Sequence, residues 1–409
     1  MKKTIALLIA IALMCTLFVG CASSSASTDT PATETPAATD NPAATETPMA
    51  DEAPAADAQT LKIGVVCPQS GSSAISGVII ANSVQMAVDE INANGGINGN
   101  IPIELYSEDD ESVPATSVTV VQKLVEQDKV NAIIGSQASS CTLANMEVTK
   151  AAKIPQITPA SSNVTITQQG NPYIFRMTST DAINAATLLK YCQSKGYTKI
   201  SMCYDSSDFG TGGYNIVSGL APDYGIEIVA AEVYNTGDTD FSVILGKMDA
   251  AKPDTFFMWG YHTETAAIMT QMRQYGYDYG MVGFGMNSPE LTVLGGDAVE
   301  GIVFCTAFDA ANPDPTVQAF DKKYVEKFKN SYDQNGPQSY DAVYLIADAV
   351  ERAIANGADW TNGEVLRDYI ASAQYEGVTG TTSFDETGEM VKDLMVITIK
   401  NGEHEIVNW

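Results

Sequence analysis

The sequence predicts an α/β protein built from two doubly wound, mainly parallel sheets with helices on both faces. Two observations lead to this prediction. From Leu61 onward, short apolar runs typical of buried strands alternate with segments of helical periodicity. The alternation restarts at residue 182, and 409 residues are enough for two domains of ordinary size, each with its own core.

The first unit follows the order strand, helix, strand, helix, strand. Strands are expected at 61–66, 101–106 and 130–135, and helices at 76–93 and 112–127. Gly95 and Gly96 should end the first helix, because glycine accepts a left-handed conformation that other residues resist. Pro114 suits the first turn of the second helix. This order needs crossover connections, which favour a parallel sheet.

The second unit repeats the pattern, and a third set of elements follows it. Helices are expected at 182–196, after Gly213, at 241–250 and at 340–357, and strands at 199–204, 226–234, 254–260 and 301–308. The C-terminal segment 382–403 is strand-like. Asp109 and Asp110 follow a strand directly, and we interpret them as a solvated helix-cap region rather than a metal site.

Residues 1–20 have the pattern of an export signal. Lys2 and Lys3 precede an uncharged apolar run that is too short to span a membrane, and "FVGC" then ends at Cys21. The motif resembles the lipobox of bacterial lipoproteins, although Phe18 stands where Leu is usual. A lipid on Cys21 would anchor the mature chain to the outer face of the cell membrane; a plain secreted protein is the alternative.

Residues 21–60 are expected to form a disordered spacer. Between 22 and 60 the chain is almost entirely Ala, Ser, Thr, Pro, Asp and Glu, without Lys or Arg, and cannot bury enough apolar surface to fold. Removing the signal takes away two lysines and no acid, so the net charge falls from −28 to −30. Such a charge argues against nucleic acid or anionic lipid as a partner.

Cysteine and histidine usage gives no sign of a metal site or a cofactor. The five cysteines of the folded part lie at unrelated spacings, mostly in apolar runs, and are expected to be small buried side chains: Cys67, Cys141, Cys192, Cys203 and Cys305. Only two histidines occur in the chain, His262 and His404, which leaves few ligands for zinc.

Two hydroxyl-rich segments follow strands of the first unit. "IIGSQASSCT" carries Ser139 and Ser140, and "ITPASS" carries Ala160 to Ser162. A serine nucleophile would need a sharp elbow such as G-x-S-x-G with a histidine base, and neither pattern occurs. At strand ends beside helix N-termini, small residues and hydroxyls can instead hold a carboxylate with neutral donors. Simple helix capping remains an alternative at this point.

The chain from residue 60 to 409 resembles the extracellular solute-binding proteins of ABC transporters, of the leucine/isoleucine/valine-binding type. The resemblance rests on several motifs in order: "IGVVCPQSG", "AVDEINANGGINGN", "IIGSQASS", "ITPASS", "YDSSDFGTGG" and "SFDETGE". It implies two lobes joined by three crossover strands, with the ligand cleft between them. Lobe 1 would comprise 61–181 and 308–390, and lobe 2 would comprise 182–307 and 391–409.

The resemblance also implies a binding site for an amino acid. Ser139, Ala160 and Ser162 match the positions that meet the ligand's carboxylate. Asp181 matches an acid near the ammonium group.

Further matches lie around the ligand's side chain. Phe209 stands where the family often has Tyr, and Tyr261 matches an aromatic residue of the second lobe. Ser76 falls where several members have a large aromatic residue over the side-chain pocket. Trp259 is either a further aromatic of this pocket or an ordinary core residue.

One family feature is missing. The acid that neutralises the α-ammonium is replaced by Gly285 or Phe284, depending on the gap chosen. A buried ammonium without a carboxylate is costly. Either Asp181 alone or the more distant Glu290 serves the ammonium, or the ligand is not an α-amino acid.

We therefore expect a monomeric, non-enzymatic binding protein without cofactor or metal. Its ligand would be a small carboxylate, an amino acid with a branched-chain or larger apolar side chain, which it passes to an ABC permease. A sensor built on the same lobes and a surface hydrolase are the alternatives. A hydrolase would lose turnover on Ser139→Ala.

Overall fold

The first sheet has the strand order β2-β1-β3-β4-β5, and all of its strand pairs are parallel. In the computed structural model, the described residues are 59–71, 73–310, 312–390, 392 and 394–409, and they belong to one compact unit. The predicted signal peptide, Cys21 and nearly all of the spacer lie outside the described residues. The strands are β1 (Leu61–Cys67), β2 (Ile103–Asp109), β3 (Ala132–Gly135), β4 (Gln156–Thr158) and β5 (Ile174–Arg176).

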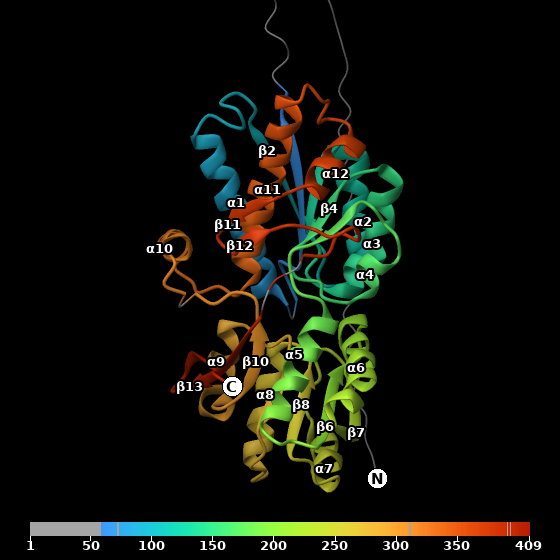
Figure 1. Cartoon of the computed structure of the whole chain (residues 1–409), viewed down its shortest axis with the longest axis vertical. Helices are drawn as coiled ribbons and strands as arrows, with labels where there is room; N and C mark the ends of the chain where they lie inside the picture. The colour runs from blue at the N-terminus through green and yellow to red at the C-terminus, as the bar shows by residue number, and fades with distance from the viewer. Residues whose placement is uncertain (1–58, 72, 311, 391, 393) are drawn as a thin grey trace, which may run out of the picture. The chain divides into compact units, whose positions relative to one another are not determined.

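Helices cover both faces of this sheet because its strands are apolar on both faces. Leu61, Ile63 and Val65 pack with α1 and α11, whereas Val66 packs with α2 on the other face. α1 and α11, far apart in the sequence, lie side by side (Figure 1). The elements around this sheet are α1 (Ala74–Ala93), α2 (Pro114–Lys123), the π-helical turn η1 (Leu124–Asp128), α3 (Ser139–Ala152), α4 (Thr165–Gln168), α10 (Pro315–Phe328), α11 (Asn335–Ala355), α12 (Gly363–Ala371) and the hairpin β11 (Tyr375–Gly377) and β12 (Gly380–Thr382).

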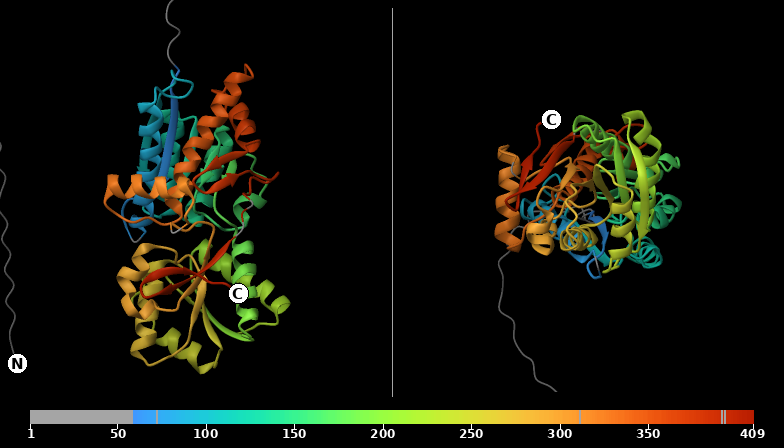
Figure 2. Two further views of the ribbon diagram at one scale, coloured as in Figure 1. Left: turned by 60° about the vertical axis from the view of Figure 1, so that its left-hand side comes forward. Right: turned by 90° about the horizontal axis from the view of Figure 1, so that it is seen from below.

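The second sheet has the order β14-β13-β10-β9-β8-β6-β7, and its strand pairs are parallel except for two antiparallel pairs, β10 with β13 and β13 with β14. These two strands form a hairpin near the C-terminus (Figure 2). The strands are β6 (Lys199–Asp205), β7 (Glu227–Tyr234), β8 (Thr255–Trp259), β9 (Met281–Phe284), β10 (Val303–Thr306), β13 (Met395–Lys400) and β14 (Glu403–Ile406).

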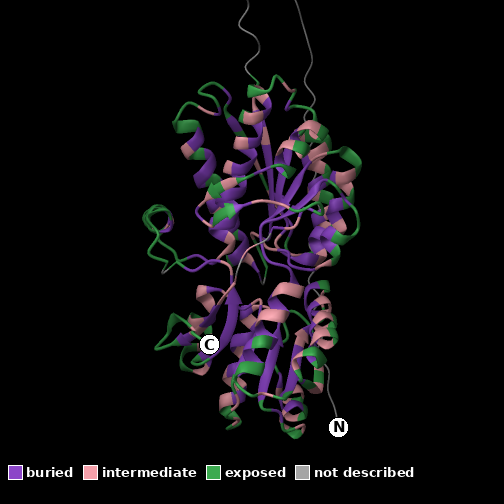
Figure 3. Cartoon of the chain, viewed as in Figure 1, coloured by how far each residue is buried: buried purple, intermediate pink, exposed green. Residues whose placement is uncertain are grey.

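Alternate residues of β8 enter two cores. Phe256 and Met258 pack with α8, whereas Phe257 and Trp259 pack with α5 and α6. Figure 3 shows buried strands between helices whose outer faces are exposed. The helices are α5 (Asp181–Ser194), α6 (Asp208–Leu220), the 3-10 turn η2 (Ala221–Tyr224), α7 (Ser242–Ala250), α8 (His262–Gln274), α9 (Pro289–Gly295) and the 3-10 turn η3 (Gly296–Val299).

The chain passes between the two sheets three times: after β5, after β10, and between β12 and β13. The predicted architecture of two doubly wound sheets with three crossovers is therefore confirmed. By length and composition α1 could cross a membrane, but 56% of its most apolar stretch is buried inside the protein. It is a core helix of the first sheet.

Three local expectations differ from the structure. The helix expected at 340–357 begins earlier, at Asn335. The strand-like segment 382–403 is interrupted because Asp385 accepts hydrogen bonds from the N–H groups of Thr387 and Glu389, which turns the chain before β13. Asp110 is not solvated: its side chain is buried and accepts a hydrogen bond from Ser117.

Five cysteines of the described residues are free and buried, as expected. Among those residues, no group of three or more His, Cys, Asp or Glu is placed to hold a metal ion.

Candidate ligand-binding site

A cavity of about 60 Å³ lies between the loops of the two sheets. Since roughly 10–15 Å³ of such space holds one water, it has room for several waters or for one small organic ligand. First-sheet segments contribute Ser76, Gln137, Ser139, Ala160, Ser162, Asp333, Gln334 and Asn335, and second-sheet segments contribute Phe209, Tyr261, His262, Phe284, Gly285 and Asn287.

The loop after β3 is held by a network of buried hydroxyls. The Thr142 and Ser161 side-chain oxygens lie 2.8 Å apart, which links α3 to the loop after β4. The Ser161 hydroxyl also donates to the Ser136 carbonyl at 3.2 Å, and Thr158 donates to the same carbonyl at 2.8 Å. These bonds fix the segment that presents Gln137 to the cavity.

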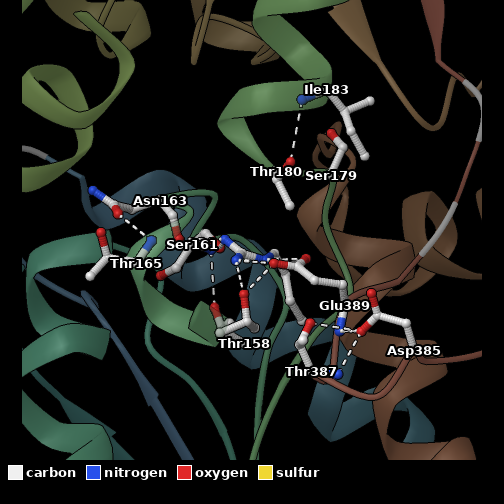
Figure 4. Close-up of polar contacts among 12 residues, drawn as sticks. Thr158, Ser161, Asn163, Thr165, Ser179, Thr180, Ile183, Asp385, Thr387 and Glu389 are labelled. Carbon is white, nitrogen blue, oxygen red and sulfur yellow. Dashed lines mark hydrogen bonds and ion pairs between the residues drawn. The ribbon is translucent and has the colours of Figure 1, made fainter. Parts of the chain in front are cut away.

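The loop after β4 is held by a buried arginine. Arg176 is fully buried, and its Nη1 donates to the carbonyls of Ser161 and Asn163 at 2.9 and 2.8 Å. Its Nε and Nη2 form a bidentate pair with Glu389, at 2.9 and 2.6 Å. Figure 4 shows Glu389 beside this loop. The pair therefore sets the backbone that carries Ala160 and Ser162.

Ser139 and Ser162 form the hydroxyl part of the cavity wall. Both side chains are buried. The Ser139 Oγ accepts a long hydrogen bond from the Asn163 N–H at 3.4 Å, whereas the Ser162 Oγ is buried near the Asp181 carboxyl and makes no hydrogen bond of ordinary geometry among the described residues. A buried hydroxyl without a partner costs free energy, so the Ser162 hydroxyl is available to a bound molecule.

Six of the eight residues that the sequence analysis named for the ligand line the cavity: Ser76, Ser139, Ala160, Ser162, Phe209 and Tyr261. Ser140 and Asp181 do not line it. Ser140 is the second residue of α3, and Asp181 begins α5, where its N–H donates to the Ser162 carbonyl at 2.9 Å.

Aromatic side chains from the second sheet form the opposite wall. The Phe209 ring lies 5.1 Å from Tyr261 and 6.1 Å from Phe284, measured between ring centroids. Trp259 is fully buried behind Phe209 and does not line the cavity, so it is a core residue.

Gly285, one of the two residues that match the missing family acid, has no room for a side chain. Gly285 has a φ of +89°, and a Cβ there would lie 2.5 Å from the Gly260 carbonyl oxygen and 2.7 Å from the Phe209 ring. Glu290, the more distant candidate, pairs with His262 at 3.2 Å and is not part of the cavity lining. His262 has a pKa lowered by burial, against the opposing effect of Glu290.

Neither histidine supports a serine hydrolase. In the described part of the chain, His262 bonds to Glu290 and His404 to Asp309, and neither has a hydrogen bond to a serine hydroxyl. Ser139 therefore has no histidine base.

Several cavity residues were missed by the sequence analysis: Gln137, His262, Asn287, Asp333, Gln334 and Asn335. Three of them belong to the short polar segment "DQN" at the start of α11. The signal was present in the sequence, because a polar segment before a long apolar helix is typical of a helix N-terminus. The helix was instead expected to begin at Tyr340.

Asp181 should make the unliganded protein less stable as the pH rises. Burial raises the pKa of its carboxyl from 3.8 to about 7, although Ser162, Arg176 and Trp259 favour the charged form. Below pH 3.8 the carboxyl is protonated in both the folded and the unfolded chain. Between there and about pH 7 the unfolded chain binds fewer protons, so the free energy of unfolding falls as the pH rises and then levels off.

Thermal unfolding of the wild type and of Asp181→Asn at about pH 5 and about pH 8 measures this effect. The melting temperature should drop less between the two pH values in the variant. An equal drop in both proteins would contradict the assignment.

Comparison with known proteins agrees with this fold. The periplasmic binding protein family profile matches residues 60–403. The leucine-, isoleucine-, valine-, threonine- and alanine-binding protein of Pseudomonas aeruginosa is 29% identical over 358 residues, which cover 86% of this chain and 90% of that protein.

Two solved structures are similar over almost their whole length. The branched-chain amino acid transporter substrate-binding protein LivJ of Streptococcus pneumoniae, in complex with isoleucine, is 32% identical with a TM-score of 0.78, over 85% of this chain and 99% of that chain. A solute-binding protein of an ABC transporter from Rhodopseudomonas palustris, in complex with 3,4-dihydroxybenzoic acid, is 25% identical with a TM-score of 0.77, over 84% and 95%.

These relatives are binding proteins and not enzymes, and the family resemblance predicted from the sequence is confirmed. The chain belongs to the periplasmic binding protein family.

Proposed function

We propose that the protein is an exported substrate-binding lipoprotein of an ABC importer, anchored through Cys21. It captures a small carboxylate, an amino acid with a branched-chain or larger apolar side chain, and delivers it as a monomer to the transmembrane subunits of a permease. The named relatives support this assignment, since they bind amino acids or serve ABC transporters. Ligand contacts with both lobes would stabilise the closed state of the two lobes. A ligand shifts the equilibrium between open and closed states only by binding one of them more tightly.

The observation that carries the proposal is the Ser162 hydroxyl, which lies in the cavity wall with Ser139 and Ala160 and has no hydrogen-bond partner in the part of the chain that the structure describes. None of the lining residues in the described part of the chain is Lys or Arg. Neutral hydroxyl and backbone N–H donors can hold a carboxylate there, because hydrogen bonds to a charged acceptor are stronger than those between neutral groups. The aromatic wall of Phe209, Tyr261 and Phe284 would then cover an apolar side chain.

Thermal unfolding of residues 58–409 against L-amino acids, their deaminated acids and their amides tests the proposal. At about 100 times Kd a ligand stabilises the fold by about 2.7 kcal/mol, which corresponds to roughly 5–10 °C. A shift with free carboxylates that is lost with the amides supports the carboxylate site. No shift with any carboxylate would refute it.

Replacing Ser162 with alanine should weaken ligand binding by about 10-fold to 100-fold, because a hydrogen bond to a charged group contributes about 1.5–3 kcal/mol. The stability of the unliganded protein should stay the same or rise slightly, since the hydroxyl is buried without a partner. Calorimetric titration of the ligand found above measures the affinity. Ser140→Ala is the matched control and should bind like the wild type; equal losses in both variants would contradict the geometry.

An aromatic carboxylate is a second candidate ligand. The aromatic wall would stack on a benzoate ring, and the similar protein from Rhodopseudomonas palustris was solved with 3,4-dihydroxybenzoic acid. Benzoates belong in the same thermal panel. A shift with benzoates but not with amino acids would assign the protein to this class of ligand.

A further inference from the structure

Asp333 is a carboxylate in the cavity wall for which the proposed carboxylate capture gives no function. It lies two residues before α11 and is 4% exposed. Because α11 packs along α1, Asp333 meets Ser76 across 257 residues of sequence. Both residues line the cavity.

The hydrogen bonds of Asp333 leave room for a ligand. Its Oδ1 accepts from the Asn335 N–H at 2.9 Å, and its Oδ2 accepts from the Asn335 amide at 3.2 Å and from the Ser76 hydroxyl at 3.3 Å. A carboxylate offers about four acceptor positions. All three donors are neutral, and within the described ranges no Lys, Arg or His forms an ion pair with Asp333.

The part of the cavity next to Asp333 is therefore suited to a positively charged group. Among the described residues that line the cavity, Asp333 is the one carboxylate, and none is Lys or Arg. The other titratable residues there are Tyr261, with a pKa raised by burial, and His262, with a pKa lowered by burial. Both stay neutral near pH 7. A buried carboxylate without a positive partner is unfavourable, and a ligand cation would relieve this.

We propose that Asp333 binds a protonated amine of the ligand, either its α-ammonium or an ammonium on its side chain. This inference rests on the proposed capture of a carboxylate ligand, and it assigns the site of the ligand's positive charge. In this chain Asp333 would neutralise the ligand's ammonium. An acid in place of Gly285 could not do so, because that position has no room for a side chain.

Asp181 is the competing acid, and its geometry is less suitable. It is also buried and its carboxylate oxygens have no hydrogen-bond partner among the described residues, but it does not line the cavity. A ligand amine would have to reach it past Ser162. Asp333, in contrast, is directly accessible from the cavity.

Four ligands with the same five-carbon chain separate the possibilities: pentanoate without an amine, L-norvaline with an α-amine, 5-aminopentanoate with a terminal amine, and L-ornithine with both. Their affinities are to be measured calorimetrically for the wild type, Asp333→Asn and Asp181→Asn. Asn at 333 can still accept the Asn335 N–H, which preserves the helix start. Asp341→Asn removes a buried carboxylate that lies outside the cavity lining and serves as the matched control.

We expect the wild type to bind at least one amine at least ~30-fold more tightly than pentanoate, and Asp333→Asn to lose this preference, as for a buried charge pair that has lost one partner. Tighter binding of norvaline would show that Asp333 binds the α-ammonium. Tighter binding of 5-aminopentanoate would show that it binds an ammonium on the side chain. If Asp333→Asn keeps the preference, or if only Asp181→Asn loses it, the inference is wrong while carboxylate capture stands. If none of the four binds the wild type, the inference is wrong, and the wider thermal panel of carboxylates decides whether carboxylate capture stands.

Proton release on ligand binding gives a second readout. Burial raises the pKa of Asp333 to about 7, so a bound ammonium should displace its proton at about pH 6. Titrations in buffers of different ionisation enthalpy should show release of roughly one proton with the amine and none with pentanoate. Burial raises the pKa of Tyr324 to about 12, so Tyr324 does not titrate there. Burial also raises the pKa of Asp181 to about 7, so the release should persist in Asp181→Asn and disappear in Asp333→Asn. Equal release with both ligands would overturn the inference.

Discussion

Replacing Arg176 with methionine is expected to lower the free energy of unfolding by about 3–5 kcal/mol, because a buried charge then loses its partner. Arg176 is fully buried, and Glu389, its bidentate partner, is 15% exposed. The substitution also removes the donors to the carbonyls of Ser161 and Asn163. The loop that carries Ser162 should therefore relax, and ligand affinity should fall together with stability. Denaturant unfolding and calorimetric titration measure the two effects.

The surface pair of Lys153 and Glu364 provides the control. Its atoms lie 2.7 Å apart, close to the 2.6 Å of the buried pair, but its side chains are 60% and 50% exposed. Lys153→Met should cost at most about 1 kcal/mol. The double variant Arg176→Met, Glu389→Leu should be more stable than Arg176→Met alone, since it leaves no unpaired charge. If Arg176→Met and Lys153→Met lower the free energy of unfolding by similar amounts, burial of the ion pair does not determine how much its loss destabilises the protein.

The sequence predicted the parts of the site that depend on local order. Ser139 and Ser162 follow parallel strands, and the carboxyl ends of such strands meet at one edge of the sheet. Their place in the cavity wall could therefore be anticipated. The two sheets followed from the alternation of strands and helices, because each apolar pattern needs a face on which to pack.

The parts that were missed depend on contacts between distant segments. Arg176 meets Glu389 across 213 residues, and Ser76 meets Asp333 across 257. No periodicity or motif of one segment contains such a pairing. Asp110 shows the same limit on a smaller scale: an acid after a strand is usually solvated, but here Ser117 binds it inside the protein.

Replacing Gly285 with alanine is expected to destabilise the protein by about 2–6 kcal/mol. The φ of +89° strains any residue with a Cβ by about 1–3 kcal/mol. The added methyl group would also lie 2.5 Å from the backbone oxygen of Gly260, which cannot turn away as a side chain would, and overpacking costs about 1–3 kcal/mol more. Because Phe209 is the other neighbour, its ring should move into the cavity and weaken ligand binding.

Gly301 separates the two causes. Its φ is +78°, and a Cβ there would have no atom within 4 Å. Gly301→Ala should therefore show the backbone strain alone, and the difference between the two variants in denaturant unfolding should give the cost of the contact. If the two variants lose the same stability and bind ligand equally well, the contact at Gly285 is unimportant. If the difference is found, Gly285→Glu should not supply an ammonium site either, because the backbone excludes a side chain there. The acid that balances a bound amine must then come from another segment of the cavity wall, and Asp333 is the carboxylate that lies in it.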